Sequence, residues 1–485
     1  MHDPLDTPPE VLSRQGRTAP IDAMEPVYES FVQIERDFAT HELALEGVHV
    51  WSALRQQVFN RTLVNSGMAK PFQTKKRLSR WKIAVAGPIN FLWRNPLLRR
   101  GQADYLVMKW ERLQKVGSEF QDAISRQVLA ELPDKRTLKL DSADDLWQPG
   151  DGTFSLSPIT FIAKVVARIL PAKLSPAEVE RIAQIEQAMR DRLGVKVPLQ
   201  TWFRRYARFF RCRAWFFEQV IRRWGIKIVF VVVYYGKPEL LAAAKRAGAR
   251  VIDLQHGLMS QRHLAYDFAE GINPHYRPDA ILLFGDHWRR AARHAPGVKL
   301  IVGGAPHIRA SIDLARQQAS GTRRPEVLFL SQPSICDQLL AFALAFSKLE
   351  GAPKVLYRPH PGDRIEALNA AIGAANATNI ELVAGGGGAR TLALQGELKY
   401  QVGVYSTALL EGVAVGCSSF VAPMPGWAYM AQHVEAGHMR LVASPEELLD
   451  GINVQGAEAA GIDDVVDEIF SLPRPGALRE FIQNA

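Results

Sequence analysis

The sequence predicts an α/β protein in which two Rossmann-like halves, each built on a parallel sheet, face a cleft. At 485 residues the chain is longer than one hydrophobic core usually serves. Short apolar runs rich in β-branched residues recur along it, separated by segments with helical spacing. One such run, 226–234, leads through an alanine-rich helical segment, 238–247, to another at 250–254. That succession is the strand–helix–strand unit of a parallel sheet.

The composition is that of a folded protein with a basic surface. Hydrophobic residues make up 47% and charged residues 22%, which excludes the disordered and fibrous classes. Lys and Arg number 59 against 50 Asp and Glu, giving a net charge of +9. This excess favours anionic partners such as nucleotide phosphates, an acidic polysaccharide, a phospholipid surface or nucleic acid. An ordinary solvated surface explains the same excess equally well.

The cysteines and the N-terminus point to the cytoplasm. Cys212, Cys336 and Cys417 lie far apart and form no CxxC pair, so neither a zinc site nor a disulfide framework is expected. The first residues lack a basic stretch followed by an apolar run, so we expect no secretory signal. The apolar stretch 83–93 contains a proline and is about half of the ~20 residues that span a bilayer, so no transmembrane helix is expected.

The N-terminal part is predicted to be a tail followed by helices. Residues 1–25 are rich in proline and lack apolar periodicity, which predicts a flexible tail. Apolar residues at intervals of three and four over 28–65 predict a helical extension, assigned to 26–100. Later, Ser175, Pro176 and Glu178 form a helix-start signature, so a helix is expected to run to about residue 193.

Two Rossmann-like halves follow, an acceptor half over 101–310 and a nucleotide-donor half over 311–485. Their boundary is placed near 305–325, where 316–324 is polar. The strands expected in the first half are 104–109, 137–141, 226–234, 250–254, 279–284 and 299–302. Those expected in the second half are 326–330, 354–357, 380–383, 400–404 and 419–422.

Arg358-Pro359-His360-Pro361 directly follows a predicted strand. Two prolines restrict the backbone on either side of the histidine and so hold its imidazole and the arginine at a defined angle. Arg358 offers a forked cation, and His360 can donate to a phosphoryl oxygen and supply a proton to a leaving group. These residue types suit a phosphate site. The alternative is a proline-rich turn with a surface histidine.

Gln255-His256-Gly257 follows another predicted strand, in the first half. A histidine beside a permissive glycine can approach a substrate and act as a general base near neutral pH. An acceptor hydroxyl needs such a base, because it is a poor nucleophile while protonated. The alternative is a histidine satisfied by the backbone of its loop.

A third motif, Tyr405-Ser406-Thr407, follows a strand of the second half. Ser406 or Thr407 can cap the next helix, whose first N–H groups form an anion site. One turn on, Glu411 faces the same way and can accept hydrogen bonds from a ribose or sugar hydroxyl. Any helix can start with Ser or Thr, so this motif alone is a weak signal. Its support comes from its place in the same half, and at the same strand-end edge, as the histidine motif.

Together the three motifs resemble those of a group of cytoplasmic glycosyltransferases. The group includes CDP-glycerol glycerophosphotransferases of teichoic acid synthesis, bacterial polysialyltransferases, and capsule or lipopolysaccharide Kdo transferases. The similarity covers roughly residues 225–450. These families have the GT-B architecture of two Rossmann-like halves.

The resemblance implies a role for each motif. His256 would be the base for the acceptor hydroxyl, His360 with Arg358 would stabilise the donor phosphate, and Ser406 and Thr407 would bind the same phosphate. The acidic-acidic-glycine motif of polysialyltransferases has no clear match, because Asp144-Asp145 is followed by Leu146. Asp253 and Asp267 therefore remain reserve candidates for the base.

The segment 201–217 combines five arginines with eight aromatic residues. Such a helix can lie on an anionic membrane, with arginines toward the headgroups and rings at the interface. Its aromatics surround the helix and form no single stripe, so packing between domains is an equally open alternative. Stacking on nucleic acid is the least favoured, and no nucleic-acid partner is expected.

The sequence thus predicts a metal-independent glycosyltransferase of capsule or lipopolysaccharide synthesis, cytoplasmic or peripheral at the inner membrane. Its partners would be a CMP-, CDP- or UDP-linked sugar and a glycan or lipid-linked glycan acceptor, with no cofactor and no metal. Two alternatives are an isomerase like the UDP-sugar 2-epimerases, which would need an acid and a base carboxylate in the cleft, and a non-catalytic GT-B-like module that binds glycans.

Overall fold

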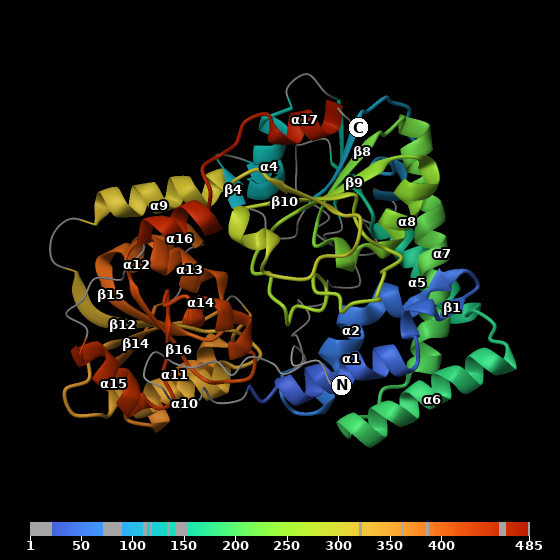
Figure 1. The fold of residues 1–485 in the computed structure, drawn as a ribbon. Coiled ribbons are helices and arrows are strands. Elements are labelled where there is room, and N and C mark those ends of the chain that lie inside the picture. Colours follow the sequence, from blue (N-terminus) through green and yellow to red (C-terminus); the bar gives the residue numbers. More distant parts are fainter. Residues whose placement is uncertain are drawn as a thin grey trace, which may run out of the picture.

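The computed structural model contains two parallel sheets, one in each half of the chain (Figure 1). It describes residues 22–70, 90–109, 114–116, 119–132, 136–141, 153–319, 323–360, 362–383, 388–454 and 462–483. The first sheet has seven strands in the order β11-β10-β9-β8-β3-β6-β7. These are β3 (Tyr105–Met108), β6 (Thr137–Asp141), β7 (Phe154–Ser155), β8 (Ile228–Val232), β9 (Arg250–Leu254), β10 (Ala280–Leu283) and β11 (Lys299–Val302).

The second sheet has six strands in the order β14-β13-β12-β15-β16-β17, again all parallel. They are β12 (Arg324–Leu330), β13 (Val355–Arg358), β14 (Ile380–Leu382), β15 (Leu398–Gly403), β16 (Ser418–Val421) and β17 (Arg440–Leu441). The predicted α/β class with two Rossmann-like halves is confirmed. Every strand expected from an apolar run is present, and among the described strands of the two sheets β7 and β17, of two residues each, were not expected. Two antiparallel pairs lie outside the sheets: β1 (Ala44–Leu45) with β2 (Val48–His49), and β4 (Gln114–Val116) with β5 (Glu119–Gln121).

Helices cover the sheets and build the N-terminal extension. Those of the first half are α1 (Glu25–Asp37), α2 (Val50–Asn65), α4 (Ala123–Ala130), α5 (Ser157–Ile169), α6 (Pro176–Leu193), α7 (Leu199–Trp224) and α8 (Pro238–Ala247). Those that follow are α9 (Pro306–Gln318), α10 (Cys336–Ser347), α11 (Ile365–Ala374), α12 (Gly388–Glu397), α13 (Thr407–Ala414), α14 (Ala431–Glu435), α15 (Pro445–Val454), α16 (Ile462–Ile469) and α17 (Ala477–Gln483). Short 3-10 helices are η1 (Thr40–Glu42), η2 (Tyr234–Gly236), η3 (Asp286–Arg289) and η4 (Trp427–Met430).

Local sequence explains the elements that were predicted best. All five residues of β8 are buried, as an apolar, β-branched run requires in a strand covered on both faces. Helix α6 begins with a complete capping box, in which Ser175 accepts from the Glu178 N–H and the Glu178 carboxylate accepts from the Ser175 N–H. It ends at Gly194, whose left-handed backbone (φ 63°) suits glycine.

Helix α7 joins two hydrophobic clusters, which favours core packing for most of segment 201–217. Its N-terminal part packs with α1, α2 and α6, through residues such as Phe203 and Phe210. Its C-terminal part packs against the first sheet, through Phe216 and Phe217. Four of the eight aromatic residues of 201–217 are therefore core residues and three more are half-buried, whereas Trp215 is exposed.

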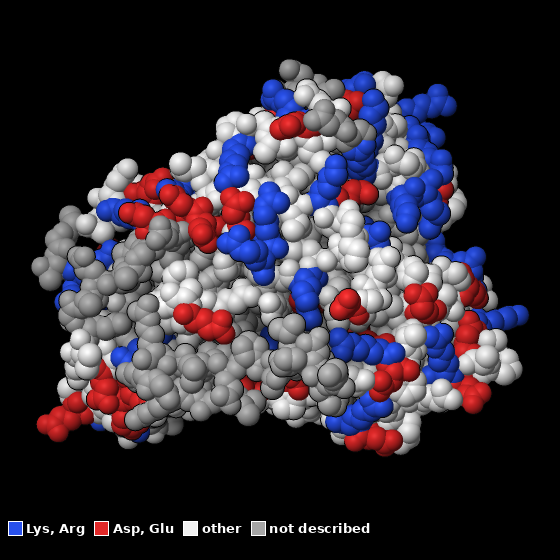
Figure 2. Space-filling model, in the orientation of Figure 1, with Lys and Arg blue, Asp and Glu red and all other residues white. Residues whose placement is uncertain are grey.

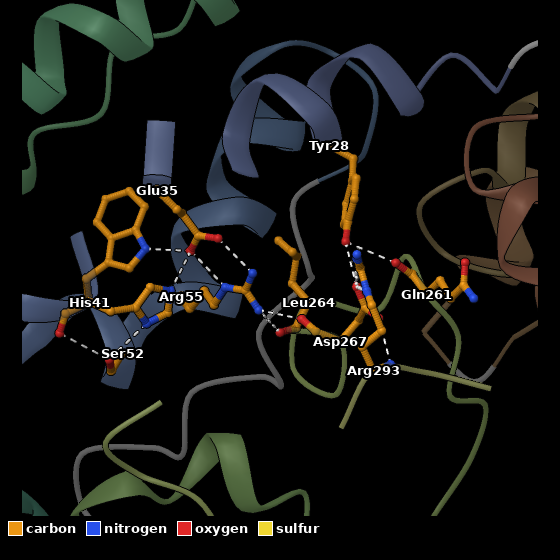
Figure 3. Close-up of polar contacts among 10 residues, drawn as sticks. Tyr28, Glu35, His41, Ser52, Arg55, Gln261, Leu264, Asp267 and Arg293 are labelled. Atoms are coloured by element: carbon orange, nitrogen blue, oxygen red, sulfur yellow. Dashed lines mark hydrogen bonds and ion pairs between the residues drawn. The ribbon is translucent and has the colours of Figure 1, made fainter. Parts of the chain in front are cut away.

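The extension is larger than predicted and contains a buried ion pair (Figure 3). The stretch expected to be helical, 28–65, consists of α1 and α2 separated by η1 and the β1–β2 hairpin, and it shares its core with α6 and part of α7. Within this core, Arg55 binds both carboxylate oxygens of Glu35 at 2.7 Å. Burial alone would raise the pKa of Glu35, but the Arg55 charge and hydrogen bonds from Arg55 and His41 outweigh it and lower the pKa to about 2.

The chain crosses between the halves twice. Helix α9 occupies the predicted boundary and contacts α4 of the first half as well as α12 and α13 of the second. After α16 the chain returns, and α17 packs on the first sheet, where Leu478 is buried. The predicted second half, 311–485, therefore extends too far, because its last helix, α17, packs on the sheet of the first half.

Of the predicted tail, 1–25, residues 1–21 lie outside the described residues, and Asp22 is the first that the structure describes. The Asp22 carboxylate is buried and accepts hydrogen bonds from the backbone N–H groups of Gly426 and Ala428, each at 3.0 Å. A residue that precedes the first helix thus contacts the loop that follows β16 in the other half.

We expect Glu35→Gln to lower the free energy of unfolding by about 3 kcal/mol, because it leaves the Arg55 guanidinium buried without a counter-charge. Urea unfolding monitored by circular dichroism measures this change. Glu29→Gln, on the exposed side of the same helix, is the control and should change stability by less than about 0.5 kcal/mol. Equal stability of the two variants would contradict the role of the ion pair.

Candidate functional site

The strand ends of the second sheet bring the predicted donor motifs to one edge. In a parallel sheet all carboxyl ends lie on the same side, where ligand crevices form. Strands β13 and β15 flank β12, so His360 and Ser406 follow strands about 10 Å apart, or two strand spacings. Gln332 follows β12 between them and holds the Tyr405 backbone, with its amide nitrogen 3.4 Å from the carbonyl oxygen and its amide oxygen 3.3 Å from the N–H.

The turn after β13 determines which nitrogen of His360 carries the proton. The Gly362 N–H donates to His360 Nδ1 at 3.0 Å, so Nδ1 is an acceptor and the neutral imidazole carries its hydrogen on Nε2. Asp363 braces the turn, because its carboxylate accepts from the His360 N–H at 2.8 Å and from the Ser331 hydroxyl at 2.7 Å. His360 therefore presents a donor, as a phosphate site requires. Pro361 of the predicted motif lies outside the described residues.

Arg358 ends β13 and is half-buried beside this turn. One of its guanidinium nitrogens, Nη1, donates to the Val383 carbonyl at 3.3 Å, which anchors the side chain at the sheet edge. A permanent positive charge is thereby held at the same sheet edge from which the turn of His360 begins.

Helix α13 supplies the second predicted anion site. Ser406 is its N-cap, and its hydroxyl accepts from the Ala408 N–H at 3.3 Å. Thr407 begins the helix, and Glu411 lies four residues on, along the same face. Burial raises the pKa of Glu411 to about 7. Near neutral pH this carboxyl group is therefore divided between its acid and its carboxylate form.

The first half contributes the loop of His256, whose next residue, Gly257, lies against the start of α13. The Gln255 side chain clamps its loop, accepting from the Phe284 N–H at 2.7 Å and donating to the Gly257 carbonyl at 2.9 Å. A Cβ atom at Gly257 would stand only 3.4 Å from Thr407 Oγ1 of the other half. Two motifs more than 140 residues apart in the sequence thus meet at the junction of the halves.

The reserve candidates Asp253 and Asp267 are both completely buried. Asp253 accepts from the Tyr266 hydroxyl at 2.9 Å and from the Tyr234 N–H at 3.1 Å. Burial raises its pKa to about 7, although these hydrogen bonds oppose the rise. Asp267 accepts from the Tyr28 hydroxyl at 3.0 Å and forms an ion pair with Arg293 (Figure 3). Both carboxylates therefore hold the loop, and neither faces a space in which an acceptor hydroxyl could lie.

A layer of rings at the junction was not predicted. Tyr235 and His263 come from the first half, and Tyr429 and Tyr405 from the second, with His263 and Tyr429 centroids 6.3 Å apart and the two second-half tyrosines 5.6 Å apart. Burial lowers the pKa of His263 to about 4, so the ring is neutral at physiological pH. Tyr405 is the one ring that its place after a strand could have revealed. Tyr235 and Tyr429 lie on short 3-10 helices and His263 on a loop, and no local pattern specifies the position of these segments.

A second histidine group lies elsewhere on the junction. His287 of η3 and His433 of α14 come from different halves, with ring centroids 4.7 Å apart. Burial lowers the pKa of His287 to about 4 and also lowers that of His433. These rings therefore pack as neutral groups.

One group in the described residues has metal-ligating atoms within 4.8 Å of one another: Glu42, His49 and His275, in the extension and a loop beside it. The two imidazole planes are stacked, with centroids 3.3 Å apart and an angle of 10° between them. Lone pairs of parallel rings point side by side and do not converge on one ion, as a metal site requires. We assign no metal to this group.

A pocket of about 770 Å³ lies beside the same histidines, between α7, α8 and the β1–β2 hairpin. Two of its arginines are paired with acidic residues that also line it, Arg211 with Glu46 and Arg246 with Glu218. None of the residues that follow strands at the junction lines this pocket. We therefore place the candidate site at the junction.

Comparison with solved structures finds proteins of similar overall arrangement. A UDP-GlcNAc 2-epimerase from Neisseria meningitidis is 10% identical with a TM-score of 0.45, covering 78% of this chain and 98% of its own. The sucrose-phosphate synthase of Thermosynechococcus elongatus is 13% identical with a TM-score of 0.47, covering 80% and 100%. The wall teichoic acid polymerase TagF is 10% identical with a TM-score of 0.40, covering 89% and 95%. At this level the likeness concerns the fold alone.

No protein family matches the sequence, and no curated protein sequence matches it either. The site is therefore argued from its own geometry.

We expect Glu411→Gln to become increasingly more stable than the wild type as pH rises. The raised pKa of Glu411 means that the native state gains stability from the protonated acid below pH 4.5 and loses it as pH rises toward 7. The glutamine cannot ionise, so its advantage should grow by up to about 3 kcal/mol across this interval and then stay constant. Urea unfolding at a series of pH values measures the difference.

The exposed Glu435→Gln is the matched control, since its side chain is not held in a buried site. If the advantage of Glu411→Gln were independent of pH, the carboxyl group would not be desolvated as described.

Proposed function

We propose that the protein is a glycosyltransferase of bacterial surface-polysaccharide synthesis that moves a sugar from a nucleotide-activated donor to a glycan acceptor. The observation that supports this most is the meeting of the Gly257 loop with Thr407 across the junction. With His256 as the base, the proposed phosphate-binding groups, which follow strands of the second sheet, would lie across the junction from it.

The donor would bind to the second half. The Nε2–H of His360, the Arg358 guanidinium and the first N–H groups of α13 are the kinds of donors that bind phosphate oxygens. Their spread over about two strand spacings suits a diphosphate or an extended phosphodiester. Glu411 lies one turn into α13, where its carboxyl group can accept a hydrogen bond from a ribose hydroxyl. A CMP-, CDP- or UDP-linked sugar meets these requirements.

The acceptor would lie against the first half. His256 would take the proton from an acceptor hydroxyl as its oxygen forms a bond to the anomeric carbon of the donor sugar. The bond from that carbon to the phosphate oxygen breaks, and the nucleotide leaves with the electron pair. Arg358, His360 and the α13 N-terminus would stabilise the negative charge that collects on the departing phosphate.

The placement of the carboxylates favours transfer over isomerisation. An epimerase would need an acid and a base carboxylate facing the sugar, but Asp253 and Asp267 are buried, the first bonded to Tyr266 and the second to Tyr28 of α1. Two histidines that face the junction from opposite halves suit a reaction between two separate substrates.

We expect His256→Ala and His360→Ala each to lower acceptor-dependent nucleotide release by at least about 100-fold, because each removes a group that acts on a proton or on the leaving phosphate. The assay incubates the protein with CMP-, CDP- and UDP-linked sugars, with and without capsule or lipopolysaccharide glycans. His275→Ala is the control, because His275 lies away from the junction, and its activity should stay within about threefold of the wild type.

Separate measurements distinguish the alternatives. If the protein interconverted nucleotide sugars without an acceptor, the result would contradict the proposed transfer and indicate an isomerase. Glycan binding without any thermal stabilisation by CMP, CDP or UDP would replace it with a binding module, since a ligand at 100 times its Kd should stabilise the native state by about 2.7 kcal/mol.

A further inference from the structure

Helix α5 presents large apolar side chains to solvent. Phe161 is 65% exposed and Ile169 is 70% exposed, and Val165 lies between them on the same face, since the three are spaced four residues apart. Ile162 and Leu170 extend this stripe. The side that packs on α7 holds small residues instead, with Ala163 and Ala167 buried. The helix thus turns its larger apolar surface away from the protein, which is the reverse of an ordinary surface helix.

Neighbouring segments continue this surface. Helix α5 runs antiparallel to α7: Arg208 donates to the Leu170 carbonyl, and the Phe154 ring, just before α5, packs edge-on against Trp224. At that end the Ser155 N–H donates to the Arg94 carbonyl. The exposed side chains of 91–98 therefore lie beside the start of α5. Ten of the fourteen large apolar side chains exposed in the described residues belong to this region: Phe91, Leu92, Trp93, Leu98, Phe161, Ile162, Val165, Ile169, Leu170 and Trp215.

Only positive charge accompanies the apolar stripe on α5 and on 90–101. Neither 90–101 nor 157–173 contains an Asp or a Glu. The exposed charged residues of these segments are Arg99, Arg100, Lys164, Arg168 and Lys173. On the helix, Lys164 and Arg168 flank the apolar stripe along one edge. Helix α7 adds further arginines, and Lys and Arg predominate at the upper right of Figure 2, over the ends of α7 and α8.

We propose that this surface, formed by residues 91–100, α5 and Trp215, docks on an anionic lipid bilayer. An apolar stripe with tryptophans and flanking cations matches the acyl boundary and the phosphate layer of such a membrane. In the described part of the chain no helix is long and apolar enough to span a bilayer, so the contact is one of a helix lying in the interface. The glycosyltransferase activity proposed above is not needed for this binding.

Charge argues against a second copy of the chain as the occupant. Pairing two such surfaces would bring Lys164, Arg168, Arg99 and Arg100 of both copies together without an acidic residue on either segment to offset them. An anionic lipid surface instead neutralises these cations. The surface also differs from the one that the sequence suggested, because segment 201–217 contributes only Trp215 to it, whereas α5 carries several exposed apolar residues.

Vesicle co-sedimentation of the full chain tests the proposal. Vesicles of phosphatidylcholine with about 30–40% phosphatidylglycerol should bind the protein at least about tenfold more tightly than pure phosphatidylcholine vesicles. Added salt should weaken this binding. Phe161→Gln with Ile169→Gln should reduce binding at least about tenfold, because it removes the apolar stripe from the acyl boundary. Lys164→Glu with Arg168→Glu should remove the preference for the anionic vesicles.

The matched control is Leu314→Gln with Val454→Gln, which changes two equally exposed apolar residues on other helices and should bind within about twofold of the wild type. All the altered side chains are exposed, so the variants should unfold at the wild-type temperature. Binding that is unchanged by the α5 substitutions would overturn the proposal. So would a dimer in light scattering that the same substitutions dissociate, since it would identify a second copy as the partner. Neither result bears on nucleotide release, which tests the proposed function separately.

Discussion

The buried ionic network around Arg55 determines where the loop after β9 lies. Arg55 binds Glu35 on one side and the carbonyls of Leu264 and Asp267 on the other, and Asp267 in turn binds Tyr28 and Arg293. Removing one partner of such a network leaves a charge buried and uncompensated, so the loss of one residue destabilises the positions of the others. The network connects the helical extension to the segment that begins with His256 and includes His263. The geometry of the first half of the site therefore depends on residues that precede its sheet in the chain.

The second half positions its groups by a different means. There the parallel sheet itself aligns Gln332, His360 and Ser406, because each follows a strand that ends at the same edge. Short hydrogen-bonded turns then orient the side chains, such as the one in which Gly362 donates to His360. A regular sheet edge therefore faces an irregular loop, and the loop needs the extension to hold it.

This contrast explains how much the sequence could predict. Strand positions and the motifs after them follow from local apolar patterns, so both sheets and the residues Arg358, His360, Ser406 and Thr407 were placed on the correct edge. Tyr235, His263 and Tyr429 were missed because they meet only through the packing of loops distant in sequence. The burial of Asp253 and Asp267 could not be foreseen either, because it depends on Tyr266 and Tyr28 closing over them. Likewise, the sequence of α5 does not indicate which of its faces is exposed, because that depends on which side of the helix packs on α7.

The contact between Asp22 and the loop after β16 has a consequence for ligand entry. Figure 1 shows α9 and α16, near the two crossings of the chain, at the top of the junction, and α1, which follows Asp22, at the bottom. The crossings join the two halves on one side of the junction, and the Asp22 hydrogen bonds join them on the other. A ligand too large to enter with that side closed can bind only to the fraction of molecules in which these bonds are broken, so its measured Kd is the intrinsic Kd divided by that fraction. Asp22 would then influence the affinity, although it need not touch the ligand itself.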